Sequence, residues 1–128
     1  RGAMASSAAP DDNNLVVMGA SAEDMSFAVN YLIENGGGQV VVADGQVLSF
    51  LHLPVGGIAS DEEPEDVARK ERELTAAAKQ LGCNLPEPLM YMFFLPITAI
   101  PDYAITDVGP VDCVKLVTFD PILELKQA

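Results

Sequence analysis

Residues 36–60 read GGGQVVVADGQVLSFLHLPVGGIAS, and this stretch decides the fold. Its centre is Asp44-Gly45, a dipeptide that supplies the positive φ values of a two-residue type I′ turn. The stretch therefore predicts a β-hairpin with a glycine hinge at either end. The turn also predicts the register of the strand pairs, which are Val42 with Val47, Val41 with Leu48, and Val40 with Ser49.

Both faces of this hairpin are largely apolar. In the predicted register one face carries Val40, Val42, Val47, Ser49 and Leu51, and the other carries Val41, Ala43, Leu48, Phe50 and His52. A strand pair that is apolar on both faces is covered on both. We expect a helix over one face and a further element, or a partner, over the other.

The composition is typical of a single domain whose high apolar content also suggests a buried interface. The chain has 128 residues, 49% of them hydrophobic, which is enough to bury a core without metals or disulfides. The longest apolar run, residues 89–95, is far too short to span a membrane. The net charge of −12 repels phosphate backbones and anionic lipid surfaces, so neither nucleic acid nor a membrane is an expected partner.

The two cysteines and the chain start give further expectations. Cys83 and Cys113 lack CxxC spacing, which favours two reduced thiols in a cytoplasmic protein over a single disulfide. Arg1-Gly2-Ala3-Met4 resembles a scar left by tag cleavage, and small, polar residues follow it. We expect residues 1–13 to form a flexible tail and residues 14–128 to form the domain.

The first half of the domain reads as strand, helix, strand. Residues 15–18 are a short apolar strand, and Ser21 can cap a helix over about residues 22–35. That helix has an apolar stripe, which consists of Ala22, Met25, Val29, Leu32 and Ile33. The order predicts that residues 15–18 and 39–43 lie parallel in one sheet, joined by a right-handed crossover.

The second half holds one more long helix and a proline-rich segment. Ser60 is a candidate cap for a surface helix that ends near Leu81. Residues 92–95 favour extended structure, residues 106–109 a turn, and residues 113–119 an edge strand. The expected fold class is α+β, with a small mixed sheet and a central hairpin flanked by two main helices.

No catalytic apparatus can be assembled from these residues. His52 is the only histidine and sits in an apolar strand, so a structural or interface role is favoured over catalysis. The carboxylates of residues 61–66 could hold a hard cation, but they also suit a solvated helix start. The glycine junctions at residues 18–21 and 55–60 have the shape of anion sites, yet carboxylates follow each of them.

The run from Met90 to Leu95 has two readings. Methionine and aromatic side chains are favoured at adaptable interfaces, so the run could form a groove for a partner. It also fits an ordinary core strand. Both readings stay open at this point.

The order and spacing of short motifs resemble those of a known family. The motifs are VVMG (16–19), DM (24–25), AVN (28–30), LIE (32–34), GGGQVVV (36–42), DG (44–45), LPVGGI (53–58), SDE (60–62), EL (73–74), LGC (81–83), LP (95–96), IP (100–101), TD (106–107), Gly109 and VD (111–112). Together they are similar to the C-terminal domain of bacterial adenine deaminase. The resemblance covers nearly everything from Asn14 to Phe119. One departure is at residues 11–14, DDNN, where the family tends to carry a DSHN-like segment, so no role is carried onto Asn13.

The resemblance implies an accessory domain of an enzyme in purine metabolism. That enzyme belongs to the amidohydrolase superfamily, and its barrel uses a divalent metal to hydrolyse adenine to hypoxanthine and ammonia. None of the family's metal ligands maps onto this chain, so we expect no catalytic residue, cofactor or metal here and no activity from the chain alone.

The expected partner is the catalytic barrel, in the same or a separate polypeptide. The expected role is structural, or the covering of the active-site mouth. The candidate interface loop consists of Gly56, Gly57, Ile58 and Ser60, because paired glycines permit close backbone approach and mobility. Two alternatives remain, a stand-alone module that binds a small molecule such as a purine and a self-association module that forms a homodimer.

Overall fold

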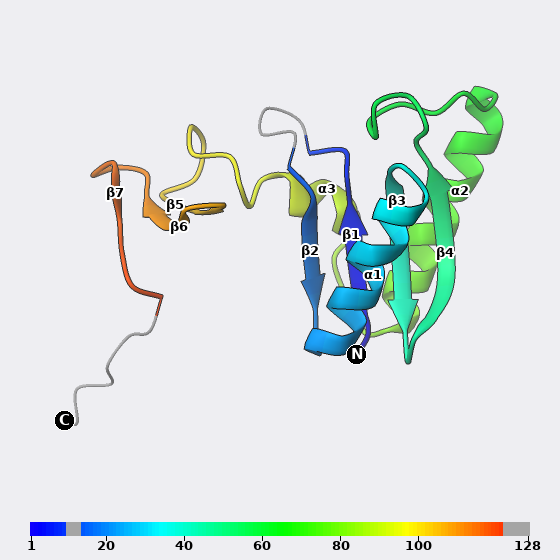
Figure 1. Ribbon diagram of the computed structural model, residues 1–128, viewed down its shortest axis with the longest axis horizontal. Helices are drawn as coiled ribbons and strands as arrows, with labels where there is room; N and C mark the ends of the chain where they lie inside the picture. The colour runs from blue at the N-terminus through cyan, green and yellow to red at the C-terminus, as the bar shows by residue number, and fades with distance from the viewer. Residues whose placement is uncertain (10–13, 122–128) are drawn as a thin grey trace. The chain divides into compact units, whose positions relative to one another are not determined.

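Figure 1 shows the computed structural model of the chain, which describes residues 1–9 and 14–121. The chain divides into two compact units, residues 1–93 and residues 94–128. Each unit is described by itself below.

The first unit is a four-stranded sheet between layers of helix. Its elements are β1 (Ala3–Ser6), β2 (Val16–Gly19), α1 (Ala22–Glu34), β3 (Gly38–Ala43), β4 (Gln46–His52), α2 (Pro64–Gln80) and α3 (Pro88–Phe93). The strand order is β2-β1-β3-β4. Helix α1 lies on one face of the sheet, and α2 and α3 lie behind the other (Figure 1). The α+β class is therefore confirmed, and α2 and α3 supply the second cover within the chain.

The N-terminal residues form an inner strand, so the expectation of a flexible tail is wrong for residues 3–6. Strand β1 pairs with β2 on one side and with β3 on the other. Ala3 and Ala5 are buried beneath α1, where they meet Ala28. Small side chains suit this position, because a helix can approach the strand closely only where no large side chain intervenes. Residues 10–13, which complete the expected tail and include Asn13, lie outside the described residues.

Insertion of β1 also overturns the expected parallel pair. Strands β2 and β3 run in the same direction, but β1 lies antiparallel between them. The hydrogen-bonded strand pairs of the described residues are all antiparallel. The hydrophobic pattern alone could not show that a strand from the chain start fills the middle of the sheet.

The hairpin of β3 and β4 is confirmed at its turn and differs in its register. Asp44 and Gly45 have φ values of 53° and 70°, as a type I′ turn requires. Val42 pairs with Val47 as expected, but a bulge between Val41 and Val42 shifts the remaining pairs by one residue. The observed pairs are Val41 with Ser49, Val40 with Phe50, Gln39 with Leu51, and Gly38 with His52.

The shift exchanges the faces of Phe50 and Leu51. Phe50 now lies beside Val40 on the α1 face, and its ring and that of Tyr31 form a T-shaped pair with a centroid distance of 5.0 Å. Leu51 is buried on the opposite face. Both large side chains thereby reach a covered position.

Helix α1 begins and ends as the sequence predicts. The backbone N–H of Asp24 donates to Ser21 Oγ at 3.2 Å, and Gly36 follows the helix with a φ of +73°. The buried stripe consists of Asp24, Ala28 and Leu32, whereas Ile33 is exposed. Asp24 can be buried because its carboxylate accepts a hydrogen bond from the N–H of Gly45, which also joins the helix start to the hairpin turn.

Helices α2 and α3 correct two expectations. Ser60 does not cap α2, because the helix begins at Pro64 with Glu63 at the N-cap position. The buried side of α2 holds Leu74, Ala77 and Ala78. The segment expected to be extended is instead helical up to Phe93, with Leu89 and Met92 buried. The spacing of three residues between Leu89 and Met92 suits one face of a helix.

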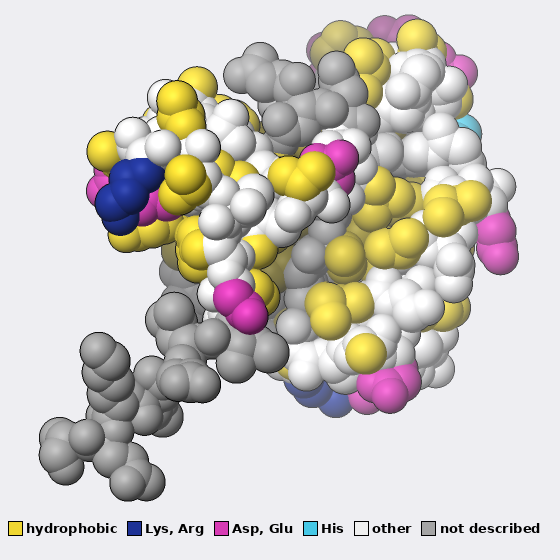
Figure 2. All heavy atoms as spheres, turned by 60° about the vertical axis from the view of Figure 1, so that its left-hand side comes forward, with side chains coloured by type: hydrophobic (Ala, Val, Ile, Leu, Met, Phe, Trp, Pro, Cys, Tyr) yellow, Lys and Arg dark blue, Asp and Glu magenta, His cyan; other side chains and the backbone are white. Residues whose placement is uncertain are grey.

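The described part of the second unit is a three-stranded antiparallel sheet. It consists of β5 (Tyr103–Thr106), β6 (Gly109–Asp112) and β7 (Val117–Thr118). The predicted turn at residues 106–109 is confirmed, whereas the predicted strand over residues 113–119 is reduced to β7. A turn closed by the N–H of Lys115, which donates to Asp112 Oδ1 at 2.9 Å, takes its place. Figure 2 shows many hydrophobic side chains on the visible surface of this unit.

Candidate interdomain surface

The loop that follows β4 is closed on itself and carries two apolar side chains outward. Val55 and Ala59 exchange backbone hydrogen bonds of 3.0 and 3.2 Å. Gly56 and Gly57 turn the chain between them with φ values of 64° and 77°, which glycine adopts without strain. The side chains of Val55 and Ile58 are 55% and 57% exposed. The loop therefore presents a small apolar tip.

The base of the loop is fixed to the sheet through Ser7. Ser7 Oγ donates to the carbonyl oxygen of Gly57 at 2.6 Å and accepts from the N–H of Gly38 at 2.8 Å. A Cβ atom on Gly37 would lie 2.4 Å from the Cα of Gly57. The glycines thus allow Gly37 and Gly57 of the chain itself to approach closely, a contact that the sequence did not predict, and the hydroxyl of Ser7 holds the two segments together.

A hollow of about 320 Å³ lies beside the loop. Its lining consists of Ser7, Leu15, Leu32, Ile33, Gly36, Gly37, Gly56 and Gly57. We call Leu15, Ile33, Val55 and Ile58, together with this hollow, the glycine-loop surface. Three of the predicted site residues belong to this surface: Gly56 and Gly57 line the hollow, and Ile58 is one of the four apolar side chains. The fourth, Ser60, is outside it, and its Oγ accepts a hydrogen bond from the N–H of Glu62. Ser7, Leu15 and Ile33 were missed, because their place beside the loop depends on the fold.

Comparison with known proteins places the chain in a family. The sequence profile of the adenine deaminase C-terminal domain matches residues 1–116. The chain belongs to this family. It is 77% identical over 125 residues to Adenine deaminase 1 of Desulfotalea psychrophila and 59% identical over 126 residues to Adenine deaminase 1 of Latilactobacillus sakei. It is 44% identical over 115 residues to an adenine deaminase of Clostridium botulinum.

The match covers nearly all of this chain but only a small part of each relative. It includes 98% of this chain but only 21% of each of the first two relatives. The chain therefore spans about a fifth of the length of these adenine deaminases. The region matched by the family includes β1, in agreement with its place inside the sheet.

His52 of this adenine deaminase C-terminal domain has a structural position. Its Nε2 lies 2.9 Å from the carbonyl oxygen of Asn35, and its ring lies 5.8 Å from that of Phe50. The contact with Asn35 joins the end of β4 to the end of α1. The histidine is absent from the lining of the glycine-loop hollow.

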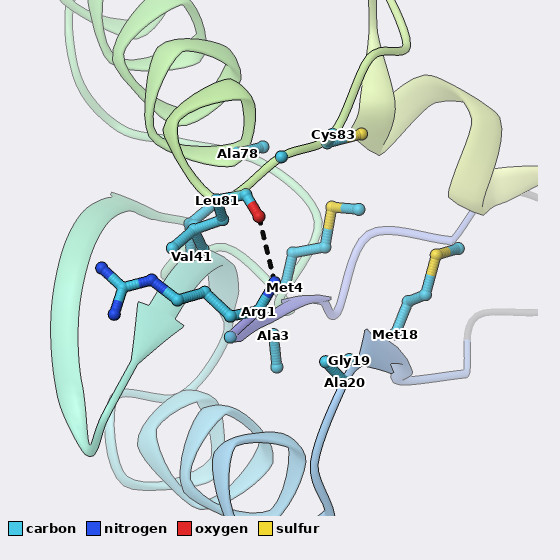
Figure 3. A pocket seen from close by; sticks show the side chains of 12 residues that line it. Arg1, Ala3, Met4, Met18, Gly19, Ala20, Val41, Ala78, Leu81 and Cys83 are labelled. Atoms are coloured by element: carbon cyan, nitrogen blue, oxygen red, sulfur yellow. Dashed lines mark hydrogen bonds between the residues drawn. The ribbon is translucent and has the colours of Figure 1, made fainter.

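A second cavity, of about 300 Å³, lies between the sheet and the end of α2 (Figure 3). Met4 and Met18 extend side by side from β1 and β2 into it, and Leu81 borders it from the end of α2. Arg1 carries the only charge among the described lining residues, and its guanidinium pairs with Asp44 at 3.0 Å. A purine requires several placed donors and acceptors, so this apolar lining does not favour a purine site.

Two of the acidic residues around the start of α2, Glu62 and Asp66, pair with basic residues of that helix. Glu62 pairs with Lys70, and Arg69 pairs with Asp66 and Glu73 at 3.0 and 2.8 Å. The hydrogen bond that Arg69 donates to Asp66, followed by the one that it donates to Glu73, raises the pKa of Arg69 above its ordinary value. Within residues 1–9 and 14–121, no group of three or more His, Cys, Asp or Glu side chains could hold a metal ion.

In the second unit one ion pair shifts the pKa values of both of its members. Lys115 Nζ lies 2.8 Å from Asp112 Oδ2. The hydrogen bond from Lys115 lowers the pKa of Asp112, and the same bond raises the pKa of Lys115. Elsewhere in the described chain, Cys83 and Cys113 are both free thiols, and no described helix is long and apolar enough to cross a membrane.

Proposed function

We propose that the chain works as the non-catalytic C-terminal domain of an adenine deaminase, the enzyme that hydrolyses adenine to hypoxanthine and ammonia. Its role in that enzyme is structural: it packs against the catalytic barrel and helps to cover the mouth of the active site. The glycine-loop surface is the contact that we assign to the barrel.

One observation carries the proposal. The relatives match nearly the whole chain, yet the chain supplies only 21% of the length of the first two. Hydrolysis of this kind uses a metal-activated water, and a metal needs clustered His, Cys, Asp or Glu ligands. No such cluster exists among the described residues. The divalent metal and the catalytic groups therefore belong, in this proposal, to the remaining four fifths of the enzyme.

The geometry of the glycine-loop surface suits a packing role. Val55 and Ile58 are held at the tip of a closed loop, and Ser7 fixes the base of that loop to the sheet. An apolar tip on a fixed base can bind a partner without first losing conformational entropy. Two free cysteines also support the reducing cytoplasm as the place where the enzyme works.

The isolated chain is expected to show no response to adenine. Incubated with adenine and Zn²⁺, Mn²⁺ or Fe²⁺, it should release no ammonia, because its described residues cannot hold the metal. Adenine should also leave its melting temperature unchanged, since only a ligand that binds the folded state raises stability. Metal-dependent ammonia release would overturn the proposal, and a saturable rise in melting temperature would favour a purine-binding module.

Ile58→Lys in the full-length deaminase tests the contact with the barrel. Burial of a charged side chain at the packed interface is costly, so kcat/KM for adenine should fall about tenfold or more. Leu48→Lys is the matched control, because Leu48 is also exposed but lies on β4 and outside the glycine-loop surface. Equal kcat/KM values for the two variants and the unmodified enzyme would show that the loop does not contact the catalytic part.

A further inference from the structure

One face of the small second sheet is apolar, as its strand register shows. Residues directly opposite each other in antiparallel strands share a face. Tyr103 lies opposite Asp112, Ile105 lies opposite Pro110, and Asp112 lies opposite Val117. Phe119 follows two residues after Val117, and its ring meets that of Tyr103 at 5.9 Å. We call Tyr103, Ile105, Val117 and Phe119 the β5–β7 face.

The second unit's own residues leave this face uncovered. Tyr103 and Ile105 are each 63% exposed, and Val117 is 50% exposed. Among the described residues of the second unit, the buried ones are only Pro96, Ile97, Ala104 and Asp112. A three-stranded sheet needs a hydrophobic face packed on another layer to be stable, and a unit this small buries too little surface by itself.

The charges on the face favour an apolar partner. The one carboxylate on the face, that of Asp112, is paired with Lys115 at 2.8 Å and accepts the N–H of the same residue. The pair leaves little net charge to be matched. The whole chain carries a net charge of −12, so two copies repel each other at long range. A second copy is therefore a poorer occupant than an apolar surface of a different region.

We propose that the β5–β7 face docks on an apolar surface of the remaining four fifths of the same deaminase polypeptide. The inference rests on the proposed function for the existence of that polypeptide, and it adds a second contact, made by the second unit. In the relatives the matched segment is covalently joined to the rest of the enzyme. Covalent attachment gives an effective concentration in the millimolar range. At that concentration even a small apolar face that binds weakly remains docked.

Hydrogen–deuterium exchange of the amides of residues 103–112 tests this docking. We expect exchange to be slower by about tenfold or more in the full-length enzyme than in the isolated chain, because docking suppresses local opening. The double variant Tyr103→Thr, Ile105→Thr should remove this difference while threonine preserves the strand propensity. The matched control is Val108→Thr, Val114→Thr, which alters two side chains, 72% and 74% exposed, that lie outside the three strands, and it should keep the difference.

Two results would overturn the proposal. Equal exchange in the isolated chain and the full-length enzyme would mean that the face stays free. Slow exchange already present in the isolated chain, together with a dimer in sedimentation that the double variant dissociates, would identify a second copy as the occupant. Neither result depends on deaminase turnover, so an enzyme that fails to deaminate adenine but protects residues 103–112 would contradict only the proposed function.

Discussion

A chain that begins at Asn14, and so lacks β1, is expected to lose the cooperative unfolding transition of the first unit. Strand β1 lies between β2 and β3, and its removal breaks both ladders at once. A hydrogen bond contributes roughly 1 kcal/mol and a buried side chain of the size of Met4 about 2 kcal/mol, so the loss approaches the 5–15 kcal/mol that holds a typical domain together. Circular dichroism during thermal or urea denaturation measures the effect.

Point variants separate the role of the strand from that of chain length. Ala5→Asp places a carboxylate at a fully buried position beneath α1 and should lower stability by about 3 kcal/mol or more. Ala22→Asp is the control, because Ala22 is exposed in the first turn of α1, where a negative charge is favourable. An unchanged urea midpoint for both the truncated chain and Ala5→Asp would mean that residues 1–13 form a tail after all.

Local signals in the sequence predict local structure well. Asp44-Gly45 has few conformations other than a type I′ turn, and Ser21 offers its hydroxyl to the first free N–H groups of α1. Both features depend on neighbours within four residues. The structure confirms both.

Features that depend on distant contacts were not predictable in the same way. The role of β1 depends on small residues that resemble a tail until α1 and the neighbouring strands are placed around them. The bulge beside Val42 depends on which large side chains of β4 reach a covered face. Residues 88–93 form a short helix although their aromatic content favours a strand, because tertiary burial of Leu89 and Met92 outweighs a weak local preference.

The same distinction between local and distant contacts applies to the candidate site. Paired glycines in the sequence indicated an approach to the barrel but did not show that a segment of this chain itself lies against Gly57. That segment is Gly37, which lies twenty residues earlier, and the hydroxyl that joins the two comes from Ser7. Only the assembled sheet brings these three residues together.

Gly37→Ala is expected to destabilise the first unit far more than the same change at the adjacent Gly36. Both glycines have positive φ, at +122° and +73°, and so each substitution incurs backbone strain of about 1–2 kcal/mol. A Cβ atom on Gly37 would also lie 2.4 Å from the Cα of Gly57, whereas one on Gly36 would meet nothing within 4 Å. The obstructing atom, the Cα of Gly57, belongs to the backbone and cannot rotate away as a side chain could. The loop that contains Gly57 must therefore move away from Ser7.

The expected loss for Gly37→Ala is about 3 kcal/mol or more, compared with about 1 kcal/mol for Gly36→Ala. Urea denaturation of the isolated chain measures both values on one scale. In the full-length enzyme Gly37→Ala should also lower kcat/KM for adenine, since it displaces the surface that we assign to the barrel. Equal stability losses for the two variants would show that the contact between Gly37 and Gly57 does not hold the loop, and that Ser7 alone does.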